Sequence, residues 1–137
     1  MSVRSFLDSN VLIYTDDAGA KAKQKAALSL VGQCQAARTG VLSTQVLQEY
    51  FVITTRRLGV DVQLARRKVE LFSRLDMVAT AVTDVLAAID LHRLHGLSFW
   101  DALIVRSALQ AGCTRLYSED LQHGRRIDAL EIVNPFR

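Results

Sequence analysis

The sequence predicts a single α/β domain, a three-layer α/β/α sandwich with a central, mainly parallel sheet. Short apolar segments typical of strands alternate with longer helical segments along the whole chain. Strands that alternate with helices form parallel sheets whose two faces are covered by those helices. The 137 residues contain one proline and no repeat, linker or low-complexity segment. We therefore expect one domain over residues 1–137, which is long enough to bury a sizeable core.

The expected strands are short and apolar, and turns or helix starts follow them. They cover residues 3–8, 40–43, 77–80, 114–118 and 131–136. A helix or helical turn is expected directly after the first strand, in NVLIYTDD. Longer helices are predicted over residues 20–40, 44–59, 61–76, 83–95 and 98–112. Gly40 and Gly59 act as stop signals for two of them, and Thr83 and Ser98 are the expected N-caps of two others.

Composition excludes several classes of protein. Half of the residues are hydrophobic, which excludes a disordered chain. No apolar run approaches the roughly 20 residues that span a membrane, and MSVRSFLDSN lacks the apolar segment of a secretory signal. We therefore expect a cytoplasmic protein without a membrane partner. Cys34 and Cys113 lack metal-ligand spacing, so we expect reduced thiols. The net charge of +3 permits a nucleic-acid partner without requiring one.

The stretch LSFWDALIV (97–105) places one carboxylate on an otherwise apolar helix face. Ile104, Val105 and Ala108 lie three, four and seven positions after Asp101 and therefore share its face. Asp101 also follows Ser98 by three residues, which fits a capping box at the helix N-terminus. Capping explains the position of this acid near the helix start, but not its direction toward the apolar stripe.

Three further acids are expected at one edge of the sheet. In an open parallel sheet, sites form outside the carboxyl ends of the strands. Asp8 closes the first predicted strand, Asp120 follows the fourth by two residues, and Glu49 lies on an inward-facing side of a predicted helix. Each has an ordinary alternative: a turn residue, a loop acid, and an ion-pair partner of Arg56 or Arg57. These alternatives do not explain why Glu49 and Asp101 each lie on the apolar face of a predicted helix.

A cluster of four acids suggests a specific chemistry. Buried like charges raise one another's pKa and are costly unless a cation neutralises them. Carboxylates select a hard cation such as Mg²⁺ or Mn²⁺ over zinc, and such an ion can activate water for attack on a phosphodiester. Basic residues bunch at 56–57, 66–68 and 125–126, which suits a nucleic-acid substrate. Such bunches also occur on ordinary solvated surfaces.

Four segments, in this order, resemble the PIN domain, and most closely its VapC-type toxin branch of bacterial toxin–antitoxin systems: FLDSNVLIY (6–14), TQVLQEYF (44–51), FWDALIVRSAL (99–109) and LYSEDLQHG (116–124). The resemblance spans essentially the whole chain. It implies a PIN-like α/β/α sandwich and a metal-dependent endoribonuclease that hydrolyses RNA. By this resemblance Asp8 and Asp101 are the primary ligands of Mg²⁺ or Mn²⁺, and Glu49 and Asp120 hold the ion directly or through water.

The resemblance also implies roles for two neutral residues and for partners. Asn10 and Ser118 match small polar positions that orient the acids by hydrogen bonding; threonine is more usual at the second position, and serine keeps the hydroxyl. A cognate antitoxin is implied, with its C-terminal tail in the active-site groove, as is a homodimer. Helices 44–59 and 61–76 would then clamp the tail, and their groove candidates, which are otherwise core residues, are Tyr50, Phe51 and Leu64.

Three other functions fit parts of the sequence. A haloacid-dehalogenase-type phosphatase needs a second acid two residues after the first, where this chain has Asn10 after Asp8. A receiver domain needs a phosphoacceptor aspartate at the end of the third strand, and Asp84 lies well past it. A PIN-like RNA-binding or interaction module without catalysis is the remaining alternative, and the complete set of four acids argues against it.

Overall fold

The computed structural model describes residues 3–137 and contains a six-stranded sheet with the order β3-β2-β1-β4-β6-β5. Strand pairs are parallel except β5–β6, which is antiparallel. The predicted mainly parallel sheet is therefore confirmed, whereas the two-residue strand β5 was not predicted. The strands are β1 (Ser5–Leu7), β2 (Gly40–Ser43), β3 (Asp76–Val78), β4 (Arg115–Tyr117), β5 (Arg126–Ile127) and β6 (Leu130–Val133).

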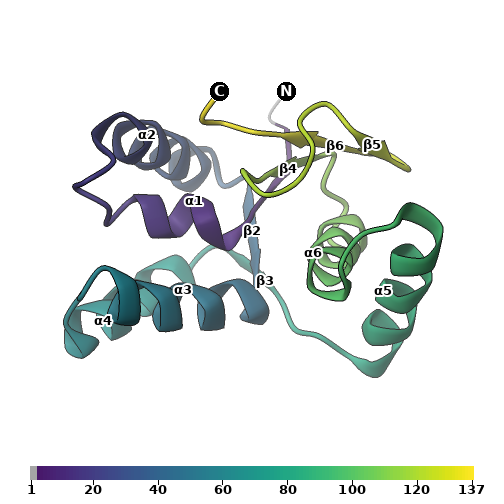
Figure 1. The fold of residues 1–137 in the computed structure, drawn as a ribbon, viewed down its shortest axis with the longest axis horizontal. Helices are drawn as coiled ribbons and strands as arrows, with labels where there is room; N and C mark the ends of the chain where they lie inside the picture. Colours follow the sequence, from purple (N-terminus) through teal and green to yellow (C-terminus); the bar gives the residue numbers. More distant parts are fainter. Residues whose placement is uncertain (1–2) are drawn as a thin grey trace.

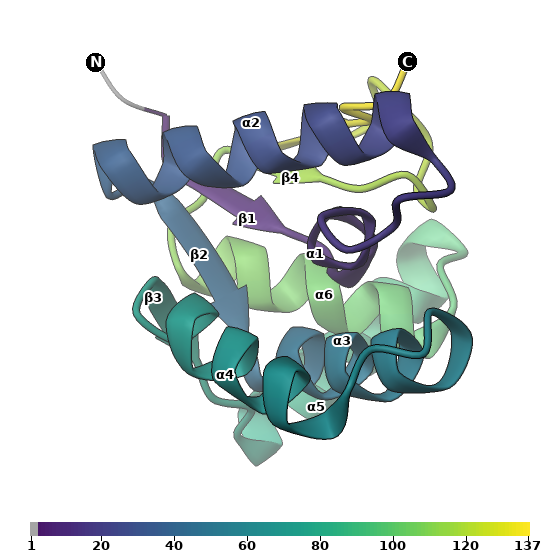
Figure 2. The same cartoon turned by 90° about the vertical axis from the view of Figure 1, so that its left-hand side faces the viewer.

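Helices cover both faces of the sheet, which confirms the three-layer prediction. Figure 1 shows the helices in two groups on opposite sides of the strands, and Figure 2 shows the side of the first group facing the viewer. The first group is α1 (Ser9–Tyr14), α2 (Lys21–Ala37), α3 (Thr44–Arg57) and α4 (Val62–Phe72). The second is α5 (Val82–His95) and α6 (Phe99–Gln110). Within residues 3–137, every helix is too short or too polar to span a bilayer.

Two helix starts show how local hydrogen bonds fix the bounds. Ser98 caps α6 as predicted, because its hydroxyl accepts a hydrogen bond from the Asp101 N–H at 3.2 Å. The predicted Thr83 cap of α5 is wrong. The helix begins at Val82 after Ala81, because the Asp84 carboxylate accepts a hydrogen bond from the Ala81 N–H at 2.8 Å. A carboxylate inside the first turn thus replaces a side-chain cap.

The centre of the sheet is buried on both faces and contributes most to the core. Every residue of β1 and β2 is buried, so neither strand alternates apolar and polar side chains, as expected where helices cover both faces. Helix α6 adds a continuous buried run from Ala102 to Val105. Cys34 and Cys113 are buried free thiols, as predicted.

The register of the sheet places two chain segments side by side at its carboxyl edge. Leu7 of β1 pairs with Tyr117 of β4, and the Asp8 N–H donates to the Tyr117 carbonyl at 3.0 Å. The residue that directly follows β4 is Ser118, whose N–H donates to the Val133 carbonyl at 3.0 Å. The residues that directly follow β1 and β4 are therefore neighbours, and the candidate site begins there.

Candidate active site

Asp8 is the most enclosed of the four predicted acids, with 3% of its surface exposed. It follows β1 and is the N-cap of α1, where its Oδ1 accepts a hydrogen bond from the Ser9 N–H at 2.7 Å. Its Oδ2 accepts one from the Ser118 hydroxyl, also at 2.7 Å. Both donors are neutral, so the carboxylate is fixed in orientation without a compensating positive charge.

This environment raises the pKa of the Asp8 carboxyl to about 7. The main cause is burial, which disfavours the charged form. The hydrogen bonds from Ser118 and Ser9 lower the pKa but only partly offset burial, and the negative charges of Glu49 and Asp120 raise it further. The influence of the two other acids shows that they lie close enough to Asp8 to interact electrostatically.

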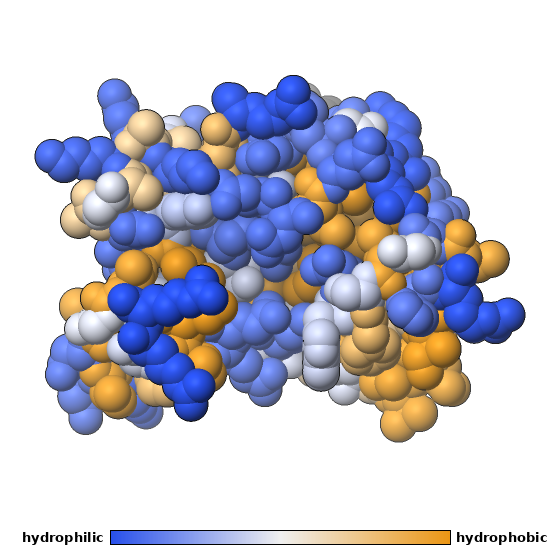
Figure 3. Space-filling model, in the orientation of Figure 1, coloured by the Kyte–Doolittle hydropathy of each residue, from blue (hydrophilic) through white to orange (hydrophobic). Residues whose placement is uncertain are grey.

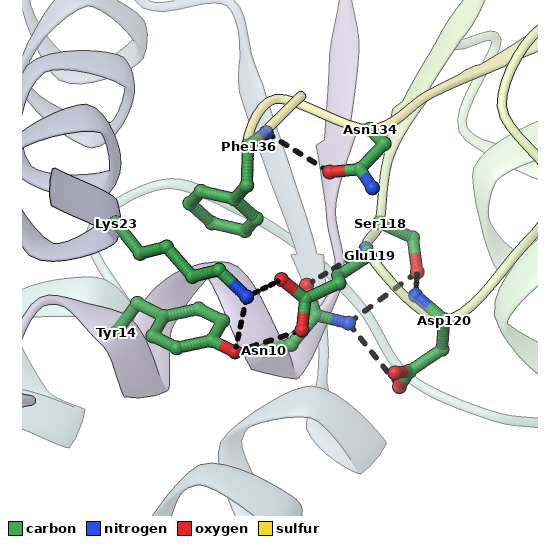
Figure 4. Close-up of polar contacts among 8 residues, drawn as sticks. All are labelled: Asn10, Tyr14, Lys23, Ser118, Glu119, Asp120, Asn134 and Phe136. Atoms are coloured by element: carbon green, nitrogen blue, oxygen red, sulfur yellow. Dashed lines mark hydrogen bonds and ion pairs between the residues drawn. The ribbon is translucent and has the colours of Figure 1, made fainter. Parts of the chain in front are cut away.

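Ser118 and Asn10 connect Asp8 to Asp120 through a short hydrogen-bond network. Figure 4 shows the contacts among Asn10, Ser118 and Asp120. The fully buried Ser118 hydroxyl accepts from the Asp120 N–H at 3.2 Å. The Asn10 Nδ2 donates to the Asp120 Oδ2 at 3.3 Å and to the Ser118 Oγ at 3.4 Å. The structure thus brings both predicted neutral residues next to the acids. Asp120 itself is exposed at the surface.

Glu49 and Asp101 face the same site from two helices. Both are partly buried, Glu49 on α3 and Asp101 in the first turn of α6. Burial raises the pKa of each carboxyl. The charges of Asp101 and Asp120 raise the pKa of Glu49 further, and the charge of Asp120 does the same for Asp101. The four acids, which come from four separate segments, therefore influence one another's pKa, and their assignment as one site stays a prediction.

The four acids have no ion-pair partner among the side chains that the structure describes. Within residues 3–137, none of the four acids forms an ion pair with lysine, arginine or histidine. In the same residues, no three His, Cys, Asp or Glu side chains lie close enough together to hold a metal ion directly. The all-oxygen donor set nevertheless fits a hard cation held partly through water, since Mg²⁺ commonly uses one or two carboxylates and keeps several waters.

A second cluster, missed by the sequence analysis, borders the acids. The Tyr14 hydroxyl donates to the Glu119 Oε1 and the Lys23 ammonium donates to its Oε2, both at 2.7 Å. The Glu119 N–H donates to the Asn10 Oδ1 at 3.2 Å, so Glu119 fixes the loop between Ser118 and Asp120 (Figure 4). Lys23 and Glu119 are separated by 96 positions, and no local pattern marks such a pair.

Two of the groove candidates now have clear environments. Tyr50 is fully buried, and its ring packs edge-on against Phe72 at a centroid distance of 5.1 Å. Its hydroxyl donates to Asp16 at 2.5 Å. Tyr50 is therefore a core residue. Leu64 of α4 is 53% exposed and stays available to a partner.

The sequence of residues 5–129 matches the family model of the PIN domain. The chain belongs to the PIN-domain family. All six predicted site residues lie inside the matched part of this PIN domain: Asp8, Asn10, Glu49, Asp101, Ser118 and Asp120. A search among curated protein sequences found no match.

Solved structures of toxins share the fold of this PIN domain. Mycobacterium tuberculosis VapC20, described as a toxin that cleaves the sarcin-ricin loop, is 20% identical with a TM-score of 0.65, covering 82% of this chain and 86% of its own. A Klebsiella pneumoniae toxin–antitoxin complex is 17% identical with a TM-score of 0.67, covering 96% and 97%. VapBC2 from Rickettsia felis, bound to a promoter DNA fragment, is 17% identical with a TM-score of 0.66, covering 93% and 96%. At these identities the similarity shows a common fold.

Proposed function

We propose that this PIN domain is a metal-dependent endoribonuclease toxin of a toxin–antitoxin system. The observation that carries the proposal is the buried carboxylate of Asp8, which has no ion-pair partner within residues 3–137 and whose pKa is raised further by the charges of Glu49 and Asp120. A buried, unpaired carboxylate such as Asp8 is costly for folding, and a site that receives a cation accounts for that cost. The toxins among the structures with the same fold support the proposal.

The proposed cofactor is Mg²⁺ or Mn²⁺, held by Asp8 and Asp101 with Glu49 and Asp120 contributing directly or through water. Carboxylate oxygens are the ligands these hard cations prefer. When bound, such an ion lowers the pKa of a water molecule and stabilises the leaving oxygen of a phosphodiester. Its positive charge would also lower the raised pKa values of Asp8, Glu49 and Asp101.

The chain's own residues would orient this chemistry. The hydrogen bonds from Ser9 and Ser118 fix both oxygens of Asp8, so the site is preorganised rather than assembled on binding. Glu49 is partly buried, and with its pKa lowered by the bound cation its carboxylate would accept the proton of the attacking water. Asn10 orients Asp120 at the exposed side of the site, where RNA would enter.

An antitoxin is the proposed protein partner. The resemblance places its tail in the active-site groove between α3 and α4, and the groove between α2 and α4 offers a second surface for it. Two adjoining cavities of about 680 and 210 Å³ share Gln35 and Leu71 as lining residues. Arg38 and Arg74 line the larger cavity, and neither forms an ion pair within residues 3–137. A groove with apolar and basic side chains suits an amphipathic segment with acidic residues.

A homodimer is also proposed, and the outer surface of α5 supports it. Val82, Leu86 and Leu94 are 75%, 57% and 78% exposed, and Figure 3 shows apolar side chains gathered over this helix at the lower right. Exposed apolar patches of this kind mark protein–protein contacts. Sedimentation of the isolated protein and of a Leu86→Lys variant would test the assignment, because an added charge should dissociate a dimer formed through α5.

Cleavage of total cellular RNA by the purified, antitoxin-free protein tests the proposed function. We expect discrete fragments with Mg²⁺ or Mn²⁺, no fragments with excess EDTA, and no fragments from Asp8→Ala with either metal. The fragment ends would identify the target RNA. Folded protein that cleaves no cellular RNA with either metal, yet binds RNA equally well with Asp8→Ala, would instead indicate a non-catalytic RNA-binding module.

A further inference from the structure

We propose that the cavity between α1 and the end of α3 binds a single nucleotide of RNA beside the cleavage site, with Arg57 contacting its phosphate. This inference rests on the proposed function and assigns a substrate subsite to it. The cavity has a volume of about 230 Å³ and adjoins the acids, because Asn10 and Asp120 are among its lining residues.

The size and lining of this cavity suit a nucleotide. Its volume is below the roughly 300–1,000 Å³ of pockets for drug-sized ligands, so it accommodates one base or ribose rather than an extended chain. Ile13, Ile53 and Leu58 supply apolar surface, against which the faces of a base or sugar can pack. Asn10 and Tyr14 add polar side chains to the lining; the Asn10 amide contacts Asp120, and the Tyr14 hydroxyl already donates to Glu119.

The charged residues that line the cavity are one arginine and three acids, Asp17, Glu119 and Asp120, of which Glu119 is already paired with Lys23. Among the described residues that line the cavity, Arg57 is the only cation. It is exposed in the last turn of α3 and forms no ion pair within the described part of the chain. A guanidinium that is free to bind matches the oxygens of a phosphate, and a cation held by Asp120 would reduce the repulsion between that phosphate and the acids of the lining.

Arg56 offers a matched control in the same turn of the same helix. It has the same charge, is also exposed, and adds equally to the favourable interaction with the helix C-terminus. It does not line the cavity. Any effect of net charge on RNA attraction, or of charge on helix stability, should therefore appear in both Arg56→Gln and Arg57→Gln. An effect of the proposed subsite should appear in Arg57→Gln alone.

The test compares the kinetics of both variants on a short RNA that contains the cleavage site, and on versions shortened from either side. Loss of a contact made equally in ground state and transition state raises KM and leaves kcat unchanged. We expect Arg57→Gln to raise KM about tenfold and to reduce the salt dependence of kcat/KM by about one phosphate contact. Arg56→Gln should leave kcat and KM within about twofold of wild type. Shortening the RNA by the nucleotide that occupies the cavity should raise the KM of wild type but leave the KM of Arg57→Gln unchanged.

Binding measurements keep this inference separate from the proposed function. In an Asp101→Asn background, fluorescence anisotropy of a labelled, mixed-sequence short RNA should show about tenfold weaker binding for Arg57→Gln than for Arg56→Gln. Equal effects of the two variants on RNA would overturn the subsite, even if wild type is an active nuclease. An effect of Arg57→Gln on antitoxin-peptide binding alone would also overturn it, because the cavity would then be a protein site.

Discussion

Two aspartates of this PIN domain are almost equally buried, yet they have opposite environments. Asp8 and Asp84 are 3% and 2% exposed, and each accepts a hydrogen bond from a backbone N–H at a helix start. The Asp84 Oδ1 also contacts the Arg106 Nε at 2.9 Å. The backbone bond from Ala81, followed by the contact with Arg106, lowers the pKa of Asp84. Burial without any such cation raises the pKa of Asp8 to about 7.

This difference in environment indicates that Asp84 stabilises the fold, whereas Asp8 is available for chemistry. The pair of Asp84 and Arg106 joins α5 to α6, so its charge is neutralised inside the protein. Asp8 has neutral donors and two other acids nearby, so its charge is compensated only by something from outside. Perturbed pKa values cluster at functional sites for this reason, and the two aspartates provide an internal control for each other.

Asp101→Asn should produce the largest effect, on activity and not on the fold. Replacing the Asp101 carboxylate by an amide removes one of the two primary ligands proposed for the cation. Such an ion stabilises the transition state of cleavage by several kcal/mol. We expect RNA cleavage to fall by about 10³-fold, measured as initial rates with saturating Mn²⁺. The circular dichroism spectrum and the melting temperature in EDTA should be unchanged or slightly improved, since a repelling charge is removed. Normal cleavage by this variant would rule out a metal-binding role for Asp101.

The second-largest effect is expected in the pH dependence of stability, where Asp8 and Asp84 should act in opposite directions. In EDTA, folded Asp8 retains its proton up to pH of about 7, whereas the unfolded chain releases it near the ordinary value of 3.8. Asp8 should therefore make the unfolding free energy fall by on the order of 3 kcal/mol as the pH rises from about 4 to 7. Asp8→Asn should remove this part of the fall and leave the part due to Glu49 and Asp101, whose pKa values are also raised. Asp84 acts in the opposite direction: its lowered pKa adds stability that is lost as the pH drops below about 4.

Urea titrations of wild type and Asp8→Asn at several pH values, with and without Mn²⁺, would measure this difference. Bound Mn²⁺ should remove the wild-type fall, because the cation stabilises the charged carboxylate. Parallel pH profiles of the two proteins in EDTA would show that Asp8 does not have a raised pKa.

Asp84→Asn should destabilise the fold while leaving the site intact. The substitution leaves Arg106 without its partner between α5 and α6, and loss of one member of a buried pair is strongly destabilising. Because the Arg106 side chain is 29% exposed, we expect a loss of about 2 kcal/mol in urea unfolding. Asp90→Asn is the matched control, since Asp90 lies on the same helix with 67% exposure and a long contact of 3.8 Å to Arg93. Equal losses for the two variants would contradict the structural role of Asp84.

Ser118→Ala should have the smallest effect, on metal affinity. The variant removes the donor to the Asp8 Oδ2 and the acceptor for the Asp120 N–H, and losses of such supporting contacts typically cost about tenfold or more in affinity. We expect about tenfold weaker Mn²⁺ binding by calorimetry, with Ser118→Thr close to wild type because it keeps the hydroxyl. An unchanged affinity in Ser118→Ala would show that the hydroxyl does not orient the acids.

The sequence predicted the parts of this site that follow from strand ends and helix faces. Asp8 ends the first strand, and the spacing around Asp101 places it beside the buried stripe of α6, so local patterns were sufficient. The contact of Lys23 and Tyr14 with Glu119 was not predictable, because only the register of β1 against β4 brings α1 and the Ser118–Asp120 loop together. Similarly, the start of α5 depended on the carboxylate of Asp84, which no cap preference at Thr83 reveals.

Calorimetric titration of Mn²⁺ into EDTA-stripped wild type and Asp8→Asn near pH 7 tests the central claim most directly, when performed in two buffers with different ionisation enthalpies. Because the pKa of Asp8 is about 7 in the free protein, binding should release protons from wild type. Asp8→Asn should bind at least about tenfold more weakly and with less proton release. Folded wild type that binds no Mn²⁺, or an Asp8→Asn variant that binds it equally well, would contradict the assignment of these acids to a metal-dependent nuclease.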